Sequence, residues 1–76
     1  MEKILEILTE IRPDIDFEQE ELLVESGLLD SFDIVSIISE LNDAFEINIR
    51  VHDLKPENFN SLDAIQTLVQ RKLSEK

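Results

Sequence analysis

The sequence predicts an all-α fold: a small antiparallel four-helix bundle, with three longer helices, one short helix and a long first loop. Large aliphatic residues recur at helical spacing in three segments, and only one Gly and two Pro interrupt the chain. Hydrophobic residues make up 42% of the 76 residues, which favours a folded chain over a disordered one despite the high charge. We expect a single domain over residues 1–76.

The first segment, residues 2–12, predicts an amphipathic helix that ends before Pro13, because proline disfavours helical geometry in the residue before it. Its aliphatic face consists of Ile4, Leu5, Ile7, Leu8 and Ile11. Residues 14–27 follow as a long connection, which must be anchored by packing in so small a domain. The expected anchors are Phe17, Leu22, Leu23 and Val24.

A second helix is predicted over residues 31–45, where Asp30 suits the N-cap and Asp33 adds favourable negative charge to the first turn. Its wide apolar stripe comprises Ile34, Val35, Ile37, Ile38, Leu41, Ala44 and Phe45. Residues 46–52 alternate like a strand, but no other segment could pair with them. They therefore predict an extended loop whose buried aliphatic residues are Ile47, Ile49 and Val51.

A short helical turn is expected around Pro56, and the last helix is expected to begin after Ser61 as N-cap. One face of that helix carries Leu62, Ile65, Leu68, Val69 and Leu73. The four aromatic residues are widely spaced, which indicates core packing rather than a platform for stacking bases; they are Phe17, Phe32, Phe45 and Phe59.

The charge is strongly negative and unevenly distributed. Seven Lys and Arg against 18 Asp and Glu give −11, and eleven of these acids lie between residues 13 and 49 with no Lys or Arg among them. Such a field repels phosphate backbones and anionic lipids, so it disfavours nucleic-acid and membrane-surface binding and favours a basic partner. With no long apolar run at the amino terminus and no cysteine, we expect a cytoplasmic protein without disulfides or stable membrane insertion.

The most informative stretch is Gly27-Leu28-Leu29-Asp30-Ser31-Phe32-Asp33. It places a serine hydroxyl at the start of an acidic helix, where backbone N–H groups and the helix dipole favour a phosphate. Ser31 could therefore be the attachment point of a phosphate-linked group. The same residues also allow a purely structural reading, in which Ser31, like Asp30, is only a helix cap.

Leu29-Asp30-Ser31-Phe32, followed by the helical run 34–45, resembles the attachment motif of the acyl carrier protein family. The Asp-Ser-Phe form is similar to that of D-alanyl carriers and of many stand-alone or assembly-line carriers. The likeness covers nearly the whole chain, including the approach to the serine, the exit of the second helix and the entry to the last one. Ser36, Ser39 and Arg50 depart from the carriers of fatty-acid synthesis, which favours an amino acid or a specialised acyl group as cargo.

The resemblance implies that Ser31 accepts 4′-phosphopantetheine from coenzyme A through a separate phosphopantetheinyl transferase, with Asp30 helping to position the serine. The chain would then be a monomeric carrier and not an enzyme, and its prosthetic thiol would supply the sulfur that the chain lacks. Enzymes that load and transfer acyl or aminoacyl groups would dock through basic patches. The residues that would meet them are Leu29, Phe32, Asp33, Val35, Glu40, Asp43 and Glu46.

Three alternatives come from the residues themselves. An acidic helical interaction module without a prosthetic group would share the composition. Asp14, Asp16, Glu18 and Glu25 have the spacing of an EF-hand loop, but Gln19 replaces the turn glycine, so we expect no EF-hand metal site. Weak binding of a divalent cation to this acidic stretch stays open. His52, the only histidine, could be combined on paper with Ser31 and an aspartate, but no nucleophile-elbow sequence surrounds the serine.

Overall fold

The computed structural model describes residues 2–75, which form helices α1 (Glu2–Ile11), α2 (Ser31–Phe45), α3 (Pro56–Phe59) and α4 (Leu62–Ser74), with a 3₁₀ turn, η1 (Val51–Asp53). No strand occurs among these residues. The all-α prediction is confirmed, with three longer helices and one short one. The start and end predicted for α2 and the N-cap of α4 are also correct, whereas η1 was not predicted.

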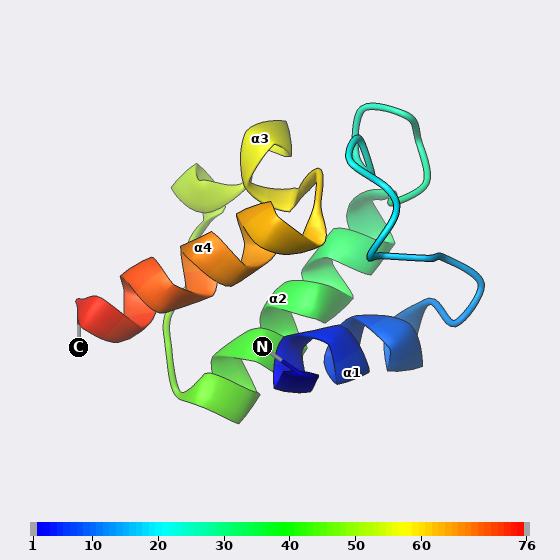
Figure 1. Cartoon of the computed structure of the whole chain (residues 1–76). Helices are drawn as coiled ribbons and strands as arrows, with labels where there is room; N and C mark the ends of the chain where they lie inside the picture. Colours follow the sequence, from blue (N-terminus) through cyan, green and yellow to red (C-terminus); the bar gives the residue numbers. More distant parts are fainter. Residues whose placement is uncertain (1, 76) are drawn as a thin grey trace.

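Helix α2 lies at the centre, with α1 and α4 packed against it and α3 packed on α4 (Figure 1). Helix α1 runs against α2, as expected of an antiparallel pair. Helix α4 instead runs broadly in the same direction as α2, because the chain from Glu46 to Ser61 returns past η1 and α3 before α4 begins. No helix within residues 2–75 has the length and apolar character needed to cross a bilayer.

Every helix contributes to one hydrophobic core, together with the two long connections. Its fully buried side chains are Ile4, Leu8, Leu23, Ile37, Leu41, Phe59, Ile65, Leu68 and Val69. Each such side chain stabilises the fold by roughly 1.5–3 kcal/mol relative to exposure. Ile47 and Ile49 are buried as predicted, while the side chain of Val51 lies outside the described part of the structure.

Two core predictions are wrong. Leu22 does not anchor the first connection, because it is 55% exposed. The buried residues of this connection are Ile15, Phe17, Leu23 and Leu29. Phe32 is not a core residue, because it is 85% exposed. Residues of a helix advance by about 100° each, so Phe32 points away from the side of α2 that Ile37 and Leu41 bury against its neighbours.

A buried ion pair joins η1 to α4. The carboxylate of Asp53 lies 2.8 Å from Lys72 Nζ, and both side chains are at most one-tenth exposed. Arg71 approaches Asp53 at 3.6 Å, and the backbone N–H of Arg50 donates to Asp53 Oδ2 at 3.0 Å. Burial, the largest influence, raises the pKa of Asp53, but the hydrogen bonds from Lys72 and Arg50 and the nearby positive charges hold it below its ordinary value.

We expect Asp53→Asn to lower the free energy of unfolding by about 3 kcal/mol at pH 7, because it leaves Lys72 buried with reduced compensation. The folded-state pKa of Asp53 is the lower one, so its contribution is complete above the unfolded value of 3.8 and is lost as pH falls through the folded value. Urea denaturation from pH 7 to pH 3 should therefore show the gap between wild type and variant closing at the acid end. Asp16→Asn, at an exposed loop carboxylate, is the control; a gap independent of pH would contradict this account.

Candidate functional site

Asn60 fixes the middle of the connection between α1 and α2. Its backbone carbonyl accepts a hydrogen bond from the Leu23 N–H at 2.8 Å, and its side-chain Oδ1 accepts one from the Val24 N–H at 3.0 Å. Its Nδ2 donates to the Glu25 carboxylate at 2.8 Å. The connection is thus bound to the segment between α3 and α4 before it turns toward α2. That turn passes through Gly27, whose φ of 85° lies in the left-handed region that favours glycine.

Arg12 ties the end of α1 to the last part of the same connection. Its Nη1 donates to the Leu28 carbonyl at 3.0 Å and to Asp33 Oδ2 at 2.5 Å. Its Nε and Nη2 donate to the two carboxylate oxygens of Asp14 at 3.0 and 2.9 Å. These hydrogen bonds raise the pKa of the Arg12 guanidinium and lower the pKa of Asp14. One side chain therefore joins α1, the connection and the first turn of α2.

Asp30 and Asp33 form a capping box at the start of α2. The Asp30 carboxylate accepts a hydrogen bond from the Asp33 N–H at 2.9 Å, and the Asp33 carboxylate accepts one from the Asp30 N–H at 3.3 Å. Asp30 is therefore the N-cap, as predicted. The expectation that Asp33 is an exposed docking acid is wrong: its side chain is 15% exposed, because the cap and Arg12 engage it.

Ser31 is the first residue of α2 and is exposed. Its hydroxyl makes no hydrogen bond to any residue of the described chain, and the cap is Asp30, so the reading of Ser31 as a helix cap is wrong. The first N–H groups of a helix have no intrahelical acceptor. Those of Ser31 and Phe32 lie in the turn where the helix dipole favours negative charge. An accessible hydroxyl therefore stands where a phosphate is favoured.

The exposed face of α2 changes character along its length. Phe32 is 85% exposed and Val35 is 61% exposed, so the turn next to Ser31 is apolar. Ser36, Ser39 and Asp43 follow on the same side, since residues three or four apart share a helix face. The face thus passes from apolar to neutral polar to acidic, moving away from the serine.

A small apolar recess lies between the first connection, α2 and α3. Its volume is about 70 Å³, and it is lined by Val24, Ile34, Leu54, Lys55, Pro56 and Phe59. Pockets that enclose drug-sized ligands measure about 300–1,000 Å³, so this recess is several times smaller. It has no room for a long hydrocarbon chain in this conformation.

The predicted partner-binding residues do not all reach the surface. The prediction that Leu29 meets partners at the surface is wrong. Leu29 is 3% exposed and belongs to the core, where its N–H donates a hydrogen bond to the Leu23 carbonyl. Its predecessor Leu28 is only half-buried. The other predicted residues are exposed except for Asp33; they are Phe32, Val35, Glu40, Asp43 and Glu46. Glu46 also ends α2 in the left-handed conformation, with φ 54°.

Neither the calcium-loop pattern nor His52 forms a reactive cluster. No group of three or more His, Cys, Asp or Glu within the described residues could hold a metal ion, and Asp14 is bound by Arg12. His52 lies 3.8 Å from Asp53 and is 71% exposed. It belongs to η1, and among the described residues no hydrogen bond or ion pair joins it to Ser31.

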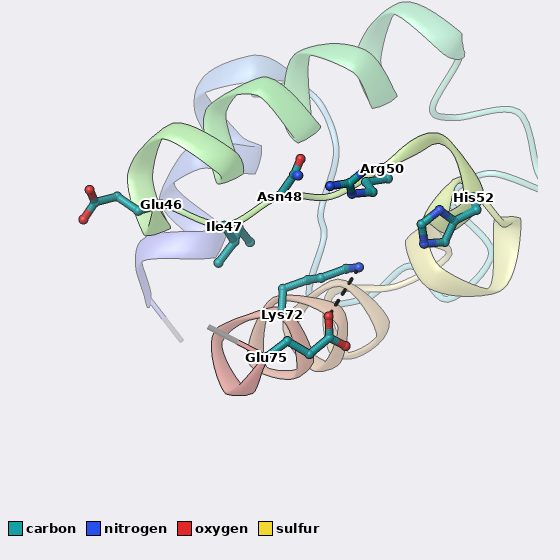
Figure 2. Close-up of a pocket in the computed structure, with 7 residues that line it drawn as sticks. All are labelled: Glu46, Ile47, Asn48, Arg50, His52, Lys72 and Glu75. Atoms are coloured by element: carbon teal, nitrogen blue, oxygen red, sulfur yellow. Dashed lines mark ion pairs between the residues drawn. The ribbon is translucent and has the colours of Figure 1, made fainter.

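A larger concavity, of about 420 Å³, lies between the segment that follows α2 and the last turns of α4 (Figure 2). It is lined by Glu46, Ile47, Asn48, Arg50, His52, Lys72 and Glu75. Lys72 pairs with Asp53 at 2.8 Å and lies 3.8 Å from Glu75. Because charges of both signs alternate around it, the concavity favours neither an anion nor a cation.

Sequence reasoning missed Arg12 and Asn60, the two side chains that hold the serine-bearing segment. A signal existed for Arg12: it is the only Lys or Arg between residues 4 and 49, and it stands at the edge of the acidic segment. Asn60 carried no comparable signal, because an asparagine before a helix cap is ordinary loop composition.

Comparison with curated proteins identifies relatives over most of the chain. D-alanyl carrier proteins of Lactococcus lactis subsp. cremoris, from strains MG1363 and SK11, are each 35% identical to it over 66 residues. The D-alanyl carrier protein of L. lactis subsp. lactis strain IL1403 is equally similar. In each case the match covers 87% of this chain and 78% of the relative. No protein-family profile matches the chain, and no solved structure gives a significant match.

These relatives are 35% identical to the chain over 87% of its length. The chain therefore belongs to the phosphopantetheine-type carrier protein family that includes the D-alanyl carrier proteins.

Proposed function

We propose that Ser31 is the covalent attachment site of 4′-phosphopantetheine and that the chain carries an acyl or aminoacyl group between partner enzymes. The observation that carries the proposal is the exposed, unbonded hydroxyl of Ser31 at the capped start of α2. The donor set fits the group, because the first-turn N–H groups and the helix dipole suit a phosphodiester. When attached, the group supplies the thiol that a chain without cysteine lacks.

Attachment is proposed to use a separate transferase. Among the described residues no hydrogen bond joins the Ser31 hydroxyl to a histidine or carboxylate, which supports a transferase that supplies the base. The transfer forms a bond from Ser31 Oγ to phosphorus of coenzyme A and breaks the bond from that phosphorus to 3′,5′-ADP. The serine proton passes to a base of the transferase. Asp30 contributes by fixing the start of the helix.

Incubation with coenzyme A and a promiscuous phosphopantetheinyl transferase tests the attachment by intact mass. Wild type should gain the mass of one phosphopantetheine, and Ser31→Ala should gain none. Ser36→Ala is the matched control, because Ser36 is an exposed serine of the same helix. A wild-type chain that gains no mass, or a gain that survives Ser31→Ala, would leave an acidic interaction module as the better description.

The cargo is proposed to be an amino acid or a small specialised acyl group. The relatives are named as carriers of D-alanine, and the recess of about 70 Å³ near α2 and α3 is too small to enclose a long chain. Intact mass measurement of the loaded protein, purified from its native cell, should therefore show a small acyl or aminoacyl thioester. A long-chain fatty acyl group would contradict the proposal.

Partner enzymes are proposed to dock on the exposed face of α2. Phe32 and Val35 offer apolar contact next to the serine, and Glu40, Asp43 and Glu46 offer negative charge farther along. Opposite charge on a partner would speed association and orient the complex. The expected cytoplasmic location and monomeric state go with this proposal.

Charge reversal on α2 tests the docking face. Glu40→Lys with Asp43→Lys should lower kcat/KM for loading by the transferase about tenfold at low salt, mainly through KM, and less at high salt. Glu6→Lys with Glu10→Lys, at two exposed acids on α1, is the control for net charge, because it also reverses two charges. An equal effect of the control, or no dependence on salt, would argue against a specific acidic docking face.

A further inference from the structure

We infer that Arg12 is a positioning residue for the attachment site: it holds the segment before Ser31 in place and supplies the counter-charge that lets a phosphate stand beside the Asp30–Asp33 capping box. The inference rests on the proposed attachment at Ser31. It concerns a residue of α1, 19 positions from the serine in sequence, to which the motif around Ser31 gives no role.

The start of α2 has an electrostatic conflict that a phosphate would worsen. Its first turn holds two carboxylates, those of Asp30 and Asp33, within three residues of each other, and Ser31 lies between them. A phosphodiester on Ser31 would add another negative charge to the same turn. The helix dipole offsets part of this repulsion, but its effect is limited to the first turn and to less than one elementary charge.

Arg12 is positioned to offset the repulsion that the helix dipole leaves. Its guanidinium contacts Asp33 at 2.5 Å and is 29% exposed, so solvent screens the pair less than it would a surface ion pair. No other Lys or Arg of the described residues forms an ion pair with an acid between residues 13 and 46. The start of α2 therefore depends on this one cation.

The same side chain fixes the backbone before the serine. The bond from Arg12 Nη1 to the Leu28 carbonyl lies three residues before Ser31, and the bond to Asp33 lies two residues after it. The serine is thus held between two contacts of one guanidinium. Both bonds come from Nη1, whose direction the planar guanidinium fixes, whereas a lysine is a flexible point charge with rotatable donors. A lysine would therefore keep the charge but hold the two contacts less firmly.

Two measurements separate this role from general stabilisation. The first is the difference in melting temperature between the loaded and unloaded forms of each variant. A side chain that only stabilises the fold shifts both forms equally, whereas a counter-charge for the phosphate shifts the loaded form more. The second is the loading rate under a fixed transferase and coenzyme A, followed by intact mass.

We expect Arg12→Gln to lower kcat/KM for loading roughly tenfold or more, because the serine is less well positioned. The measured quantity is the melting temperature of the loaded form minus that of the unloaded form. In Arg12→Gln this difference should be lower than in wild type by about 4 °C or more. Arg12→Lys should have a melting difference close to that of wild type, because the charge is kept, but a loading rate that stays below that of wild type. Asp14→Asn is the matched control, because it removes the other partner of Arg12 and keeps the bonds to Leu28 and Asp33.

If Arg12→Gln does not fold, Arg12→Lys and the double variant Arg12→Gln with Asp33→Asn carry the test, since the latter leaves no unpaired carboxylate there. A wild-type loading rate in both of these variants, which lack the bonds of the Arg12 guanidinium, would overturn the inference while the attachment stands. A wild-type chain that accepts no phosphopantetheine would overturn the attachment itself and this inference with it.

Discussion

The contacts of Arg12 constrain the arrangement on which the rest of the site depends. A connection of nearly 20 residues without regular structure separates α1 from α2, and closing such a loop costs conformational entropy that its own few apolar residues offset only in part. Arg12 joins both ends of this connection, through Asp14 at its start and Leu28 at its finish. Its bond to Asp33 then fixes the position of α2 relative to α1 at the end where Ser31 is exposed.

The net charge of −11 has a different meaning once the fold is known. Some acids of the central segment stabilise the fold through specific contacts: Asp14 and Asp33 bind Arg12, Asp30 caps α2, and Glu25 binds Asn60. The acids that remain exposed on α2 lie toward its C-terminal half. The negative field that partners would meet is therefore directed along one helix and lies apart from the apolar turn beside Ser31.

Much of the fold was predictable because local rules decide it. Helix α2 begins and ends where capping and periodicity place it, and Pro13 and Ser61 mark the end of α1 and the start of α4. The errors about apolar residues have one physical cause. Apolar residues on a helix mark candidates for burial, but whether Phe32 or Ile37 is buried depends on which side of α2 its neighbours cover. Leu22 was expected to be buried and is exposed, and Leu29 was expected at the surface and is buried, because burial in the connection also depends on which neighbours cover each residue.

The sequence by itself determined the helical class, the boundaries of α2, the start of α4 and the serine at the head of an acidic helix, because periodicity, caps and prolines act within a few residues. Only the tertiary structure decided that Asp33 is bound and not free, that Phe32 is exposed, and that Arg12 and Asn60 hold the serine-bearing segment from 16 or more residues away. Those outcomes depend on which distant groups the packed helices bring within hydrogen-bonding distance. No local pattern records that information.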